Sequence, residues 1–301
     1  MDDLHRKVKP GEGWHGVVKR SEMKYLDLGL LRLGRGQEET LGGRLHETVV
    51  VLTSGQCDAF VDDSRKAERL ERANVFDAMP WAIYLPAHHK VRIKAKKPTE
   101  LIVSTAPASG KRDLAVRIIA PDQVKPVTRG SGNFEREIRN LIVSTDDTEH
   151  VVFGETINGP GNWSSYPPHK HDTNNPPTEY ALEEIYLYKF HPPQGFGFQR
   201  VYTQGRKSDQ TFLIENDHVV LLKKGYHPVV AAGGYKLYYF WIIAGAQARL
   251  CFVDDPEHAW VKQWEPGAPL PPPAAAKQAK PEKAPIQAAP KSPKKTAPGR
   301  K

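Results

Sequence analysis

Three histidines and one glutamate in the second half of the chain have the types and the spacing of a metal site. His169 and His171 lie two residues apart, Glu184 opens an aromatic-rich segment, and His227 follows a Lys-Lys-Gly turn. Residues i and i+2 of a strand point to the same face, so the first two imidazoles could share one ion. Such a ligand set suits Zn, Mn, Fe, Co or Ni, and open coordination positions would make the site catalytic. The alternative is an ordinary histidine pair, at the surface or hydrogen-bonded in the core.

The segments that must position these residues have the composition of strands. β-Branched and aromatic residues dominate them, and Gly, Pro, Asn and Asp bound them. Many short strands at regular spacing predict an all-β sandwich or barrel. We expect strands at residues 48–53, 57–61, 81–85, 90–95, 100–105, 151–156, 184–190, 196–203, 218–222 and 235–243.

A weak internal repeat predicts two related barrels. Each half contains the same order of features. A strand that begins with Glu is followed by a Gly and a second strand. A third strand, which is followed by His, and a fourth strand come next. Only the second half contains His-x-His. We therefore interpret His46, Glu47 and His89 in the first half as relics or surface residues rather than a second metal site.

The chain is expected to have three parts. A polar, Gly-rich stretch at residues 127–133 predicts a junction, with an N-terminal barrel that lacks the metal motif at 1–130 and a C-terminal barrel with the metal site at 131–265. Residues 266–301 hold ten of the 26 prolines and no aromatic residue, which predicts a disordered Lys/Pro/Ala-rich tail. Seven Lys and one Arg against one Glu give this tail +7 of the formal net charge of +8. The basic charge therefore gives no support to a nucleic-acid patch on the folded part.

Cysteine content and hydropathy give an expectation for the compartment. Cys57 and Cys251 are too few for a disulfide framework and show no C-x-x-C spacing. The first residues contain no apolar segment, and the longest apolar run, residues 237–246, is too short to span a bilayer. We expect a soluble, cytoplasmic protein with no membrane or nucleic-acid partner. A homo-oligomer is compatible with the sequence.

The order of His-x-His, Glu, Gly and Gly-x-His between strands is similar to the two motifs of the cupin superfamily. Two copies make a bicupin, with two tandem double-stranded β-helix barrels. More narrowly, the chain resembles the 5-deoxy-glucuronate isomerase family of myo-inositol catabolism at residues 161–172, 192–202, 225–229 and 254–260. The related 4-deoxy-5-ketouronate isomerases of pectin breakdown carry their Glu ligand directly before an aromatic-rich strand, which favours Glu184 over Glu183.

The resemblance implies a metal-dependent aldose–ketose isomerisation of a small sugar acid, 5-deoxy-D-glucuronate, to 5-dehydro-2-deoxy-D-gluconate. One divalent ion, with Zn or Mn favoured, would stabilise the charge that develops on the substrate oxygens. The expected ligands are His169, His171, Glu184 and His227.

The remaining site residues are predicted from the face of the strand on which they lie and from their charge. Tyr186 and Tyr188 share the parity of Glu184 and are candidates for the acid/base, with a metal-bound hydroxide and ordinary barrel packing as alternatives. Arg200 is the candidate for binding the substrate carboxylate, because a guanidinium matches that group in two hydrogen bonds, although it could equally be a surface residue. Lys170, between two ligands, should point outward.

Two other functions fit the same residues. Another metal-cupin reaction, such as a related uronate isomerisation or a dioxygenation, is compatible with three His and one Glu, and consumption of O₂ would favour a dioxygenase. A non-catalytic sugar-binding bicupin is the alternative outside enzymes. No helix-turn-helix pattern accompanies the barrels, so the sequence gives a DNA-binding sensor no support.

Overall fold

A computed structural model describes residues 3–144, 146–247, 249–265 and 267–270. Residues 1–266 belong to one compact unit. Its described residues form strands and short 3-10 helices, which confirms the all-β prediction. The predicted tail at 266–301 lies outside the described residues except for 267–270. Over the described ranges, no helix has the length and apolar character needed to cross a bilayer.

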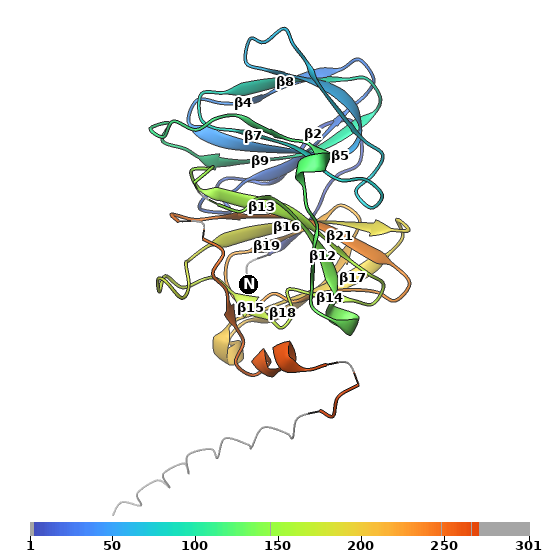
Figure 1. Ribbon diagram of the computed structural model, residues 1–301, viewed down its shortest axis with the longest axis vertical. Coiled ribbons are helices and arrows are strands. Elements are labelled where there is room, and N and C mark those ends of the chain that lie inside the picture. Colours follow the sequence, from blue (N-terminus) through green and yellow to red (C-terminus); the bar gives the residue numbers. More distant parts are fainter. Residues whose placement is uncertain (1–2, 145, 248, 266, 271–301) are drawn as a thin grey trace, which may run out of the picture. The chain divides into compact units, whose positions relative to one another are not determined.

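Two sheets that share strand β5 form the first barrel (Figure 1, blue to cyan). One sheet has the order β10-β7-β5-β9-β3-β2, and the other runs β4-β8-β5-β6. β5 can serve both because it bends near Gly55, where φ is +103° and a Cβ would lie 2.2 Å from the Pro98 carbonyl oxygen. The strands are β2 (Gly13–Val18), β3 (Leu28–Leu33), β4 (Glu38–Gly42), β5 (His46–Val61), β6 (Glu68–Arg72), β7 (Trp81–Leu85), β8 (Lys90–Ala95), β9 (Thr99–Pro107) and β10 (Arg117–Ile119).

Apolar side chains fill the interior of this first barrel. Val50 and Leu52 of β5 pack with Ile83 of β7 and Ile93 of β8 in one buried cluster. Strand alternation turns the intervening residues of β5 to the opposite face. The positions that would face a ligand in a hollow barrel are therefore occupied by aliphatic groups.

Two further sheets form the second barrel (Figure 1, green to orange, with β1 in blue). The larger has the order β1-β19-β16-β21-β13-β12-β11, the smaller runs β14-β20-β17-β18, and β15 pairs with β22 beside them. The strands are β1 (His5–Lys7), β11 (Val127–Arg129), β12 (Arg136–Ile142), β13 (Val151–Asn158), β14 (Trp163–Ser164), β15 (His169–Lys170), β16 (Glu183–His191), β17 (Phe196–Tyr202), β18 (Asp209–Glu215), β19 (His218–Leu222), β20 (Val229–Ala231), β21 (Lys236–Ala244) and β22 (Val253–Asp254). The 3-10 helices are η1 (Pro121–Gln123), η2 (Gly132–Phe134), η3 (Gln204–Arg206) and η4 (Ala259–Gln263).

The two barrels share one hydrophobic core. Val49 and Tyr84 of the first barrel belong to the same buried cluster as Ile185 and Ile242 of the second. These residues alternate with the interior positions of their strands, so each barrel presents an apolar outer face to the other. Burial of this interface holds the two barrels together as a single unit.

Glu47 contributes to the same interface. Its side chain is buried and accepts hydrogen bonds from the Tyr84 hydroxyl (2.7 Å) and from the backbone N–H groups of Glu149 (2.9 Å) and His150 (2.8 Å). Glu47 is therefore not a surface residue, because its buried carboxylate connects the barrels. His89 instead pairs with Asp62 at 2.9 Å near the surface.

Two strands from the first 130 residues pair within the second barrel. β1 pairs with β19, and β11 pairs with β12. The expected division at residue 130 stays a prediction, and the sheets show that the chain crosses between the barrels more than once. The second barrel thus depends on segments at both ends of the first.

Candidate metal centre

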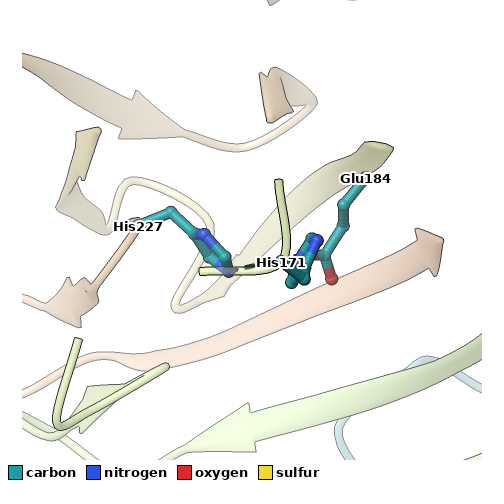
Figure 2. Close-up of side chains that lie close together, drawn as sticks. All are labelled: His171, Glu184 and His227. Atoms are coloured by element: carbon teal, nitrogen blue, oxygen red, sulfur yellow. Dashed lines mark hydrogen bonds and ion pairs between the residues drawn. The ribbon is translucent and has the colours of Figure 1, made fainter. Parts of the chain in front are cut away.

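His171, Glu184 and His227 converge in the interior of the second barrel (Figure 2). Nε2 of His171 lies 3.0 Å from Oε2 of Glu184, and Nε2 of His227 lies 3.4 Å from the same oxygen. All three side chains are buried, and their ligand atoms lie within 4.8 Å of one another. The structure therefore brings together two imidazoles and one carboxylate from three segments that span 56 positions of sequence, between residues 171 and 227.

The second nitrogen of each imidazole is fixed by a backbone carbonyl. Nδ1 of His171 lies 3.3 Å from the Leu182 oxygen, and Nδ1 of His227 lies 3.0 Å from the Gly225 oxygen. A carbonyl only accepts, so Nδ1 carries the proton in both rings. The Nε2 lone pair of His227 therefore faces the cluster, and Nε2 of His171 donates to Glu184 when that ring is protonated. Nε2 of His227 is buried without a hydrogen-bond partner. This orphaned nitrogen and the N/O donor set fit a divalent metal ion.

His169 lies next to this cluster. Its ring centroid is 4.9 Å from that of His227 and 4.7 Å from that of Phe252, on which it stacks. Its ligand atoms do not belong to the set of three that are mutually within 4.8 Å. His169 as a fourth ligand therefore stays a prediction.

Burial and neighbouring charges set the protonation of the histidines. Burial lowers the pKa of His227 to about 4, and burial with the adjacent His227 and His171 holds the pKa of His169 well below its usual value. Burial also acts to lower the pKa of His171, but the hydrogen bond and charge of Glu184 raise it overall. Neutral imidazoles are the form that binds metals. Two of the three rings are thus held in that form near neutral pH.

The loop that presents His227 depends on a glycine. Gly225 has φ of +96°, and a Cβ there would lie 2.5 Å from the Tyr202 carbonyl oxygen. Its N–H donates to Oδ2 of Asp172 at 2.8 Å, which ties the His227 loop to the segment that follows His171. Only glycine allows this close approach, which brings the loop that carries His227 close to His171.

Lys170 is directed away from the three-residue cluster, as expected, but it is buried rather than solvated. Its ammonium donates to Asp172 (2.7 Å) and to Glu179 (2.7 Å). Glu183 also points away from the cluster, because its carboxylate accepts hydrogen bonds from the backbone of residues 24–26 in the first barrel. Both residues serve to hold the segments that carry the ligands.

A cavity of about 360 Å³ opens onto the cluster, and its lining includes His169 and Glu184. Tyr186 lines the same cavity, and its hydroxyl lies 2.9 Å from Oγ of Ser165. Burial, together with the charge of Glu184, raises the pKa of Tyr186 well above its usual value. The phenol therefore stays protonated at neutral pH and can donate a hydrogen bond or a proton into the cavity.

Tyr188 has a different environment, although it shares the strand parity of Tyr186. It is fully buried and is not part of the cavity lining; its hydroxyl donates to Oε1 of Gln199 at 2.7 Å. The amide of Gln199 in turn donates to the carbonyl oxygens of His227 and Pro228. Tyr188 thus supports the His227 loop through Gln199.

Arg200 lies outside the cavity lining. Its guanidinium forms a two-bond ion pair with Asp209, with distances of 2.8 and 2.5 Å. The arginines that line the cavity are Arg129 and Arg136. Sequence reasoning missed both, because Arg129 lies in the polar stretch interpreted as a domain junction, Arg136 follows that stretch closely, and neither belongs to a motif.

Comparison with known proteins gives concordant results. The sequence profile described as the KduI/IolB family matches residues 4–261. A protein of Geobacillus kaustophilus named 5-deoxy-glucuronate isomerase is 38% identical over 245 residues, which cover 80% of this chain and 87% of that protein.

Solved structures show the same architecture. An IolB-like protein from Salmonella typhimurium LT2 superimposes with a TM-score of 0.81 at 31% identity, covering 86% of this chain and 99% of its own. An oxalate decarboxylase from Bacillus subtilis superimposes with a TM-score of 0.57 at 13% identity, covering 85% of this chain and 80% of its own, which is a likeness of fold alone. The two tandem barrels are thus a bicupin, as predicted.

Proposed function

The chain belongs to the KduI/IolB family, and we propose that it is a metal-dependent isomerase that converts 5-deoxy-D-glucuronate to 5-dehydro-2-deoxy-D-gluconate in myo-inositol catabolism. The observation that carries this proposal is the convergence of His171, Glu184 and His227 at a cavity, in a chain whose relatives bear the name of that isomerase. A cavity of this size is within the range of sites for small molecules.

The reaction moves a carbonyl from C1 to C2 of the sugar acid. A proton must leave C2, the negative charge that develops on the oxygens must be stabilised, and a proton must reach C1. A divalent ion bound by the cluster would supply that electrostatic stabilisation. No net oxidation or reduction takes place, so the barrel needs no second cofactor.

We assign Tyr186 the role of proton donor or hydrogen-bond donor to a substrate oxygen. Tyr186 lines the cavity, and its raised pKa keeps the proton in place until a developing oxyanion can take it. Ser165 orients that hydroxyl through the contact at 2.9 Å. Tyr188 is assigned a supporting role, since its hydroxyl is occupied by Gln199.

For the ion, we propose one divalent metal per chain, Zn or Mn. Imidazole nitrogens and a carboxylate oxygen suit these ions, and no thiolate takes part in the described cluster. His169 is proposed as a further ligand because its ring lies beside that of His227 and it lines the same cavity.

The proposal is tested by incubating the purified full-length protein with 5-deoxy-D-glucuronate and following the product by NMR. Treatment with a chelator should abolish turnover, and Mn²⁺ or Zn²⁺ should restore it. Oxygen uptake measured in parallel separates the isomerase from a dioxygenase. Product formation at an undiminished rate in metal-free protein, or stoichiometric O₂ consumption, would reject the proposal.

A further inference from the structure

Two arginines face one another across a hairpin at the cavity. Arg129 of β11 and Arg136 of β12 are directly paired in the strand register, and both line the cavity that contains Glu184 and Tyr186. Side chains of directly paired residues project to the same face of a sheet. Like charges in this arrangement destabilise a fold unless an anion lies between them.

The protein supplies no such anion in the part that the structure describes. Neither guanidinium forms an ion pair with a described carboxylate, and the hydrogen bond of Arg136 goes from Nη1 to the Phe134 backbone oxygen at 3.0 Å. Asp254, which also lines the cavity, is paired with Lys262. Two positive charges therefore remain uncompensated at the cavity wall.

Arg136 is partly shielded from solvent. Burial lowers its pKa from the usual value, and the adjacent Arg129 acts in the same direction, against the opposite influence of Tyr239 and Tyr186. A guanidinium does not lose its proton in practice, so a lowered pKa signifies a charge that is poorly solvated. Binding an anion would relieve this cost.

We propose that Arg136, flanked by Arg129, recognises the carboxylate of the sugar acid substrate. This inference rests on the proposed function and deepens it, because the open-chain substrate carries an aldehyde at one end and a carboxylate at the other. Glu184 of the metal cluster and the adjacent His169 line the same cavity as the guanidinium pair. One molecule can thus place its carbonyl at the cluster and its carboxylate at Arg136.

The contrast with Arg200 strengthens the assignment. A guanidinium fork matches a carboxylate in two parallel hydrogen bonds. Arg200 already uses its fork on Asp209 and stacks over Tyr202, with the guanidinium carbon 4.4 Å from the ring centroid. Arg136 uses Nη1 on the Phe134 carbonyl, and Nη2 and Nε form no hydrogen bond with the described residues, so a carboxylate is matched at Arg136 and not at Arg200.

The test compares 5-deoxy-D-glucuronate with 5-deoxy-D-glucose, in which a hydroxymethyl group replaces the carboxylate. Arg136→Gln should raise KM for the uronate roughly 10- to 100-fold with little change in kcat, because a charge-assisted hydrogen bond is lost from ground and transition states alike. Activity on the neutral sugar should not change, so the preference for the acid should fall. Arg136→Lys should give an intermediate KM, and Arg200→Gln, the matched control, should leave KM unchanged.

Binding measurements separate this inference from the proposed function. Absence of turnover in the wild-type protein would reject the isomerase assignment but would leave the carboxylate subsite untouched. Equal affinity of wild-type protein and Arg136→Gln for the uronate, measured by calorimetry on preparations with equal metal content and equal Tm, would overturn the carboxylate subsite. If Arg136→Gln fails to fold, Arg136→Lys serves as the test, since it retains the charge. An unchanged KM and an unchanged preference for the acid in Arg136→Lys would then overturn the subsite.

Discussion

Arg72 of the first barrel and Glu155 of the second form an ion pair through two hydrogen bonds, with neither side chain exposed to solvent. Nη1 lies 2.7 Å from Oε1 and Nη2 lies 2.8 Å from Oε2. The hydroxyl of Tyr238 donates to the same carboxylate at 2.8 Å, and the guanidinium also donates to the Leu52 carbonyl at 2.9 Å. Each charge is thus satisfied only while the barrels are in register.

Removing one partner of this pair should be costly. Glu155→Gln leaves the charge of Arg72 buried without its counterion, and we expect a loss of about 3 kcal/mol in the free energy of unfolding, measured with urea. Glu71→Gln, which disrupts an exposed pair with Lys97, is the matched control and should leave the urea midpoint nearly unchanged. The double variant Arg72→Met with Glu155→Leu should regain much of the loss. Wild-type stability of Glu155→Gln would contradict this account.

Acid should weaken the contact between the barrels through Glu100. Its pKa, which burial alone would raise, is lowered to about 2 by Lys189, Thr53 and Arg32. The folded protein therefore holds the ionised form more strongly than the unfolded chain does. The stability from this carboxylate is fully present above about pH 4.5 and is lost as the pH falls toward 2, a contribution of about 3 kcal/mol. Urea unfolding at a series of pH values should show a shallower acid slope for Glu100→Gln, and an identical slope would refute the role of this group.

The metal ligands should be separable from the fold. Glu184→Gln removes the negative ligand at nearly constant size, and His227→Ala removes an imidazole from the opposite side of the cluster. Each should weaken metal binding by about one to two orders of magnitude, with activity falling in parallel. His89→Ala, at the matching place in the first barrel, should leave the metal content at one ion per chain. Mass spectrometry of the native protein measures that content, and two ions per chain would be incompatible with the proposed single site.

Tyr186 and Tyr188 should differ when each hydroxyl is removed. Tyr186→Phe should lower kcat by about 100-fold with little change in KM, since Tyr186 lines the cavity. Tyr188→Phe leaves Gln199 without a buried donor and should lower metal affinity and Tm, with activity restored at high metal concentration. Equal loss of kcat in both variants at saturating metal would show that the two hydroxyls act together.

Much of the fold follows from local patterns. The predicted strands are present within a few residues of their expected ends, because alternation and β-branched composition reflect burial on one face of a sheet. The two strands expected at 48–53 and 57–61 are one strand, β5, which continues through Gly55. Gly55 allows the strand to bend from one sheet into the other. A glycine between two β-rich segments is expected both at a turn and at such a bend, so the sequence could not tell them apart.

The site was only partly accessible from sequence. The sequence predicted that Glu184 and Tyr186 share one cavity, because they lie two residues apart in β16 and therefore on the same face of that strand. The same parity could not separate Tyr186 from Tyr188, whose environment depends on Gln199 of another strand. Arg136 became visible only through its register with Arg129 and its place in the cavity wall, which no periodicity in the chain encodes.

The pairing of β1 with β19 joins the beginning of the chain to a strand more than 200 residues later. On a ribosome, His5–Lys7 emerge long before His218–Leu222 and cannot pair until those residues have been synthesised. Until then β1 has no partner strand, and an unpaired strand edge invites association with other chains. Expression of the second barrel without β1 would leave the matching edge of β19 unpaired and favour aggregation.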